Sequence, residues 1–205
     1  MILAHVVQVK NINNVTGRFP KADFDMTKWH EHTDQKDLQD SISYFKDNNN
    51  ILHIWKLKFL DKLTDTQFQK GLSVLSEAER TKALRYKFRH LQEKYIQAQY
   101  HLRYLLGLYL DITPDKVEFV LGDHGKPYLK INSDELGFKL QFNISHSKEY
   151  SVFAFTKDKE IGVDIEKIDE KPYLELADRF FTKREKDLLH AKEPDIDAIK
   201  LGFFR

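Results

Sequence analysis

Apolar and polar residues alternate in several short stretches, which is the pattern of half-buried β-strands. The clearest are residues 51–60, 150–156 and 160–168, while residues 2–9, 117–121 and 140–144 could form further strands. Residues 64–75, 92–110 and 172–181 instead repeat apolar side chains every three or four positions, which predicts amphipathic helices. Together these elements predict an α+β fold.

Two of the predicted helix starts carry the same signature. Ser76 is followed three residues later by Glu79, and Thr182 is followed three residues later by Glu185. Each pair has the spacing of a capping box, and an apolar residue precedes each cap as a hydrophobic staple. We interpret the recurrence of this pattern as a weak internal repeat, which suggests two similar α+β halves. Capping boxes are common, so chance recurrence is the alternative.

The composition is that of a globular protein, with 41% hydrophobic and 13% aromatic residues in a chain of 205. The formal net charge is +1, so no global field attracts nucleic acid or a membrane surface, and an anion site must be a local patch. The chain has no cysteine, which excludes disulfides, thiolate metal sites and a cysteine nucleophile. We read no signal peptide and no membrane-spanning run, and therefore expect a cytoplasmic protein.

In the predicted strand at residues 160–168, the carboxylates of Asp164 and Glu166 lie on the face opposite the aliphatic residues Ile161, Val163 and Ile165. Carboxylates two residues apart on a strand are separated by about 7 Å and repel each other unless a cation lies between them. Mg²⁺ is a hard cation that prefers such oxygen ligands and is often bound together with phosphate. The alternative is a half-exposed strand with two solvated acidic side chains.

Three further features carry candidate chemistry. Gly125, Lys126 and Pro127 form a bend in which glycine allows close backbone approach and lysine supplies a cation. His146 lies between two serines at the end of a predicted strand, and basic residues recur along positions 80–94. Each feature also has an ordinary explanation: a turn, a surface or capping histidine, and a solvated helix face.

Taken in order, four segments are specific: G-K-P-Y-L, F-N-I-S-H-S, I-G-V-D-I-E and R-F-F-T-K-R-E. The series resembles the 4′-phosphopantetheinyl transferases of the surfactin-synthetase-activating (Sfp) type, over roughly residues 51–205. The resemblance implies two pseudo-symmetric halves, residues 51–140 and 141–205, after an N-terminal extension of residues 1–50. It also implies a Mg²⁺-dependent enzyme that moves phosphopantetheine from coenzyme A to a serine of an acyl or peptidyl carrier protein, releasing adenosine 3′,5′-bisphosphate.

The same resemblance implies roles for individual residues. Asp164 and Glu166 match the family's metal carboxylates and are the expected catalytic pair. Ser145 and His146 match the motif that contacts the 3′-phosphate of coenzyme A. Gly125, Lys126 and Pro127 match the segment that holds the adenosine phosphate end of coenzyme A. Lys82 and Lys94 fall where the family carries basic residues that face the phosphates. A monomer with no nucleic-acid or membrane partner is expected.

The last residues, Phe203, Phe204 and Arg205, look like the segment just before the family's W-[ST]-x-K-E-x-x-x-K motif. That motif carries a third carboxylate, so we expect an incomplete C-terminal half and little transfer by these 205 residues alone. Two alternatives to the enzyme stay open. One is a catalytically impaired protein that binds coenzyme A or a carrier, and the other is an unrelated α+β interaction domain.

Overall fold

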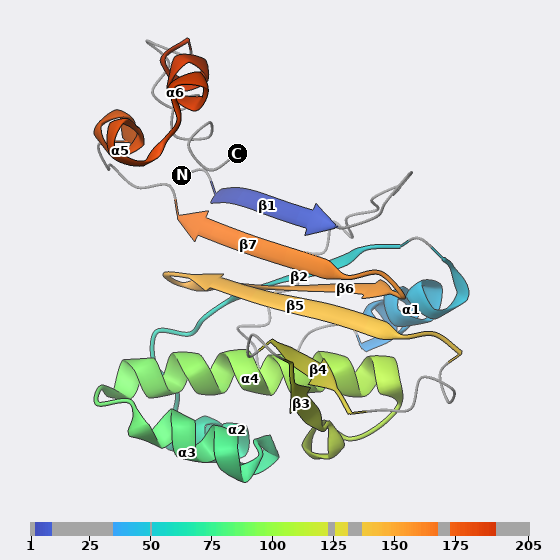
Figure 1. The fold of residues 1–205 in the computed structure, drawn as a ribbon. Helices are drawn as coiled ribbons and strands as arrows, with labels where there is room; N and C mark the ends of the chain where they lie inside the picture. Colours follow the sequence, from blue (N-terminus) through green and yellow to red (C-terminus); the bar gives the residue numbers. More distant parts are fainter. Residues whose placement is uncertain are drawn as a thin grey trace.

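The computed structural model describes residues 3–9, 35–49, 51–122, 126–130, 137–167 and 173–191. Both strands and helices are present, so the predicted mixed α+β class is confirmed. The centre is an antiparallel three-stranded sheet in the order β2–β6–β5 (Figure 1). Its strands are β2 (His53–Lys58), β6 (Tyr150–Lys157) and β5 (Leu140–Ser147), each of which falls within or around a stretch that the alternation predicts.

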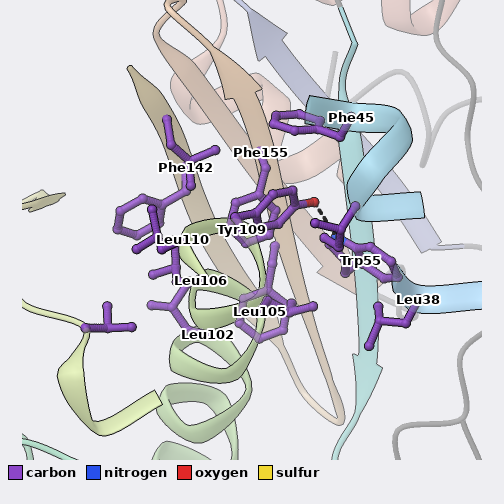
Figure 2. Packing of buried hydrophobic residues seen from close by; sticks show 14 of the residues in the cluster. Leu38, Phe45, Trp55, Leu102, Leu105, Leu106, Tyr109, Leu110, Phe142 and Phe155 are labelled. Carbon is purple, nitrogen blue, oxygen red and sulfur yellow. Dashed lines mark hydrogen bonds between the residues drawn. The ribbon is translucent and has the colours of Figure 1, made fainter. Parts of the chain in front are cut away.

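Helix α4 (Arg89–Leu110) lies along one face of this sheet (Figure 1). Its predicted apolar face is buried, and the sheet contributes every second side chain of each strand, since successive strand residues point to opposite faces. Figure 2 shows this packing. Each large apolar side chain buried here contributes roughly 1.5–3 kcal/mol. The main members are Trp55, Leu57, Leu102, Leu105, Leu106, Tyr109, Phe142, Phe153 and Phe155.

Helix α1 (Gln35–Asp47) packs into the same core, although it lies within the predicted N-terminal extension. Its residues Leu38, Ile42 and Phe45 are buried there. The Lys46 side chain donates to Asp111 at 2.6 Å, and the main-chain carbonyl of Lys46 accepts from Lys157. At least this part of residues 1–50 therefore shares the main core, and the domain boundaries stay a prediction.

A second apolar cluster joins the start of α4 to α2 (Asp65–Val74) and α3 (Glu77–Arg85), and it includes Phe68, Ala83 and Ile96. Thr64 and Ser76 cap these helices with complete capping boxes, so the predicted box at Ser76 is confirmed. After α4, a short 3₁₀ helix (Pro114–Lys116) leads to the antiparallel pair β3 (Phe119–Leu121) and β4 (Pro127–Leu129). Strand β4 forms where the sequence indicated only a bend.

Strand β7 (Ile161–Lys167) covers the other face of the central sheet and pairs with β1 (Leu3–Val9) in antiparallel fashion. Figure 1 shows β7 between β1 and the sheet. Two short helices follow, α5 (Tyr173–Phe180) and α6 (Lys183–His190), and the second predicted capping box is present at Thr182 and Glu185. Phe203, Phe204 and Arg205, which resemble the segment before the family's last motif, lie outside the described residues.

A buried polar group lies inside the main core. The Tyr109 hydroxyl accepts from Trp55 Nε1 at 3.0 Å and lies 2.8 Å from His53 Nδ1. Burial raises the pKa of Tyr109, so its hydroxyl keeps the proton, which it can donate to Nδ1 of a neutral His53. Burial also lowers the pKa of His53 from 6.5 to about 4. The neutral imidazole is therefore the form that this core accommodates.

Because the pKa of His53 is lowered by folding, we expect the free energy of unfolding to depend on pH. Between pH 6.5 and 4 the unfolded chain binds the His53 proton and the folded chain does not, so acid favours unfolding. The contribution is complete above pH 6.5 and falls by about 3 kcal/mol as the pH drops through this window. Urea unfolding from pH 4 to 7.5 should show a shallower dependence for His53→Gln, and the original dependence for His90→Gln at an exposed histidine. Identical slopes for His53→Gln and the unsubstituted chain would contradict it.

Candidate functional site

Strand β7 presents its residues as the alternation predicts. Ile161, Val163 and Ile165 are buried against the central sheet, together with Leu52, Val152 and Ala154. Asp164, between two of these aliphatic residues, is exposed on the opposite side. The side chain of Glu166 lies outside the described residues, although its backbone belongs to the same strand. The burial of three aliphatic residues therefore fixes the direction in which Asp164 points.

The carboxylate of Asp164 contacts a second predicted site residue. The hydroxyl of Ser145, on β5, donates to Asp164 Oδ1 at 2.8 Å. The same Ser145 oxygen accepts the backbone N–H of Ile165 at 3.2 Å. The structure thus brings Ser145 and Asp164 together, and the serine hydroxyl holds one carboxylate oxygen at a defined place.

Lys126 also reaches β7. Its Nζ donates to the main-chain carbonyl of Ile161 at 2.9 Å and lies 5.6 Å from the centre of the Tyr128 ring. An ammonium group has three donors, so this bond leaves Lys126 able to bind an anion beside the strand. Pro127 is the first residue of β4, while Gly125 lies outside the described residues.

The other predicted contacts lie at the β5–β6 turn and on the helices. His146 is exposed and alternates along β5 with Ser145, so the two side chains point to opposite faces. Lys94, on α4, donates to the Lys148 carbonyl in this turn at 3.0 Å. Lys82 is exposed on α3, and its Nζ lies 5.2 Å from the centre of the Tyr95 ring. Among the described residues, no hydrogen bond or ion pair joins Lys82 to Asp164.

The possible metal ligands on β7 are the carboxylate oxygens of Asp164 and Glu166, and oxygen ligands suit Mg²⁺ better than softer metals. Asp164 is exposed, and Glu166 follows two residues later in the same strand. Among the described residues, no group of three or more histidine, aspartate or glutamate side chains is placed to hold a metal ion. The donor chemistry thus fits a magnesium ion that takes further ligands from phosphate and water.

Two residues at this site were not predicted. Asn143 and Ser147 alternate with Ser145 along β5, and both accept backbone N–H groups of β7. Asparagine and serine are uncommon in strand interiors, so polar residues at positions 143, 145 and 147 formed a period-two signal that could have identified them.

The structure carries one observation on membranes. In the described part of the chain, no helix is both long and apolar enough to cross a lipid bilayer.

Comparisons with known proteins find matches over much of this chain. Residues 62–158 match the family model described as "4′-phosphopantetheinyl transferase, N-terminal". The chain is 36% identical over 155 residues to 4′-phosphopantetheinyl transferase HetI of Nostoc sp., which covers 75% of this chain and 63% of HetI. It is 30% identical over 139 residues to 4′-phosphopantetheinyl transferase Sfp of Bacillus subtilis, which covers 67% of this chain and 58% of Sfp. The chain therefore spans less than two thirds of either relative.

Proposed function

Because this chain belongs, over the stretch that the comparisons cover, to the 4′-phosphopantetheinyl transferase family, we propose that it serves phosphopantetheine transfer. The donor is coenzyme A, the acceptor is a serine of an apo acyl or peptidyl carrier protein, and the second product is adenosine 3′,5′-bisphosphate. The observation that carries the proposal is the Ser145–Asp164 hydrogen bond, because it joins two of the motifs on which the family resemblance rests. We further propose two pseudo-symmetric halves, with coenzyme A between them.

In the proposed reaction the carrier serine oxygen forms a bond to the phosphorus that bears the pantetheine arm. The bond from that phosphorus to the bridging oxygen breaks, and adenosine 3′,5′-bisphosphate leaves with this oxygen, while the serine proton passes to a base. Such transfers depend mostly on positioning and on neutralising oxygen charge. Mg²⁺, when bound, supplies that neutralisation. Asp164 and Glu166 would hold the ion, with Asp164 oriented by Ser145.

Basic residues around the strand would bind the nucleotide end of coenzyme A. Lys126 lies beside β7, and Lys94 reaches the turn that follows His146. We assign the 3′-phosphate to His146 alone, because the Ser145 side chain points to the opposite face of β5 and its hydroxyl donates to Asp164. The other phosphate contacts are assigned to these lysines and to Gly125, Pro127 and Lys82. These groups contact parts of coenzyme A that do not react, so their loss should raise KM more than it lowers kcat.

The 3′-phosphate assignment makes a prediction for His146→Ala. A hydrogen bond to a charged group is worth roughly 1.5–3 kcal/mol, so coenzyme A should bind about 10 to 100 times more weakly. Dephospho-coenzyme A lacks the 3′-phosphate and should bind nearly as before. Calorimetry with both ligands tests this, with His190→Ala on α6 as the control histidine. An equal loss for both ligands would show that His146 does not bind the 3′-phosphate.

Transfer itself is tested by mass spectrometry of an apo carrier protein incubated with coenzyme A and Mg²⁺. The W-[ST]-x-K-E-x-x-x-K motif is not among these 205 residues, so the decisive sample is the chain with that segment of a family member fused after Arg205. The fusion should add the phosphopantetheine mass to the carrier serine. Binding of coenzyme A without any transfer by the fusion would favour the impaired binding protein, and absence of both would exclude the proposed function.

A further inference from the structure

Strand β7 is joined to β5 by side chains in place of a main-chain ladder. Asn143 Oδ1 accepts the N–H of Val163 at 2.8 Å. The hydroxyl oxygens of Ser145 and Ser147 accept the N–H groups of Ile165 and Lys167 at 3.2 and 3.1 Å. Each pair is separated by 20 positions in the sequence, so the two strands run in parallel with a constant register.

In this register, hydrogen-bonded residues lie on both sides of each of the two predicted metal carboxylates. Asp164 lies between Val163 and Ile165, whose N–H groups are held by Asn143 and Ser145. Glu166 lies between Ile165 and Lys167, and the N–H of Lys167 is held by Ser147. We propose that Asn143 and Ser147 are positioning residues, which set the places of Asp164 and Glu166 by fixing the backbone on either side. This inference rests on the proposed function.

Apolar packing alone does not fix this position. Ile161, Val163 and Ile165 are equivalent aliphatic residues at a spacing of two, and hydrophobic contact is not directional. A slip of two residues along the strand would keep an aliphatic face on the sheet while moving each carboxylate by about 7 Å. Hydrogen bonds depend on distance and angle, so the three side-chain bonds select one register.

The sequence of β5 is consistent with such a role. Residues 142 and 144 face the main core as phenylalanine and isoleucine, while residues 143, 145 and 147 all carry a short polar group. A half-buried asparagine in a strand is unfavourable unless its amide is hydrogen-bonded, and here its oxygen is used by β7. The polar residues at positions 143, 145 and 147 are thus explained by their hydrogen bonds to β7.

Metal affinity separates positioning from general stability. We would titrate the chain with Mn²⁺, as a paramagnetic substitute for Mg²⁺, in the presence of coenzyme A, and measure free Mn²⁺ by electron paramagnetic resonance. Asn143→Ala and Ser147→Ala should each weaken Mn²⁺ binding by about 10-fold, as expected for groups that orient metal ligands. Ser147→Thr keeps the hydroxyl and should restore binding.

Ser151→Ala is the matched control, because the Ser151 hydroxyl lies in the same sheet but donates to the Ser145 carbonyl at 3.1 Å and not to β7. Hydrogen exchange adds a readout without metal: the Val163 amide should exchange faster in Asn143→Ala, and the Lys167 amide faster in Ser147→Ala. If the unsubstituted chain binds Mn²⁺ and both alanine variants bind it equally well, the positioning role is wrong while the proposed function stands. If the unsubstituted chain binds no Mn²⁺, the proposed metal site fails, and this inference fails with it.

Discussion

Replacing Glu79 by alanine is expected to lower the free energy of unfolding by about 3–5 kcal/mol, because it leaves a buried arginine without its charge partner. Arg103 is only 2% exposed, and its guanidinium lies 2.6 Å from the Glu79 carboxylate. Its remaining donors bind the carbonyls of Pro114 and Val117 at 3.1 and 2.7 Å. The pair therefore joins α3, α4 and the segment after α4 inside the fold.

Two variants separate this charge from the helix cap, since Glu79 also accepts from the Ser76 N–H at 2.8 Å. Ser76→Ala removes the cap but keeps the ion pair, and should cost about 1 kcal/mol. Glu79→Gln keeps the shape of the side chain and removes its charge, and should fall between the two. Glu185→Ala, at the same capping position of exposed α6, should cost much less than Glu79→Ala. Urea unfolding measures all four, and equal losses for Glu79→Ala and Ser76→Ala would contradict the role of the buried pair.

The largest effect on function is expected at Asp164. Residues that only orient metal ligands typically change affinity or activity 10- to 100-fold, so loss of a ligand itself should lower transfer by at least about 100-fold. Asp164→Asn is the sharper variant, because its amide oxygen can still accept from Ser145 while the charge is lost. The rate is measured by mass spectrometry of the carrier, using the fusion described above.

Glu160→Gln provides the control for Asp164→Asn. Glu160 is exposed and immediately precedes β7, so this change removes one negative charge close to the strand in sequence without altering the strand itself. Its transfer rate should remain within about two-fold of the unsubstituted fusion, as expected for a surface charge. A similar loss in both variants would point to a general charge effect and not to a metal ligand.

The features predicted correctly from the sequence are those set by local physics. The two predicted capping boxes are each encoded within four residues, and the apolar face of α4 follows from its own periodicity, so neither feature depends on distant contacts. The outward direction of Asp164 was likewise predictable, because strand alternation requires only that Val163 and Ile165 be buried.

The features that were missed depend on long-range pairing. The hydrogen bonds from Asn143 and Ser147 to β7 join residues 20 positions apart, and the sequence does not state which strand a polar side chain will face. Helix α1 was not predicted, because no family motif was recognised in residues 1–50, yet its Phe45 is fully buried beside Tyr109. The placement of β1 beside β7 also follows from tertiary pairing.

The central claim is that Asp164, held by Ser145, helps to bind Mg²⁺ together with coenzyme A. Calorimetric titration of coenzyme A into the chain, with Mg²⁺ and with a chelator, tests it most directly. We predict that Mg²⁺ strengthens coenzyme A binding to the unsubstituted chain and has no such effect on Asp164→Asn. Coenzyme A binding that is equally strong with Mg²⁺, with chelator and in Asp164→Asn would contradict the account.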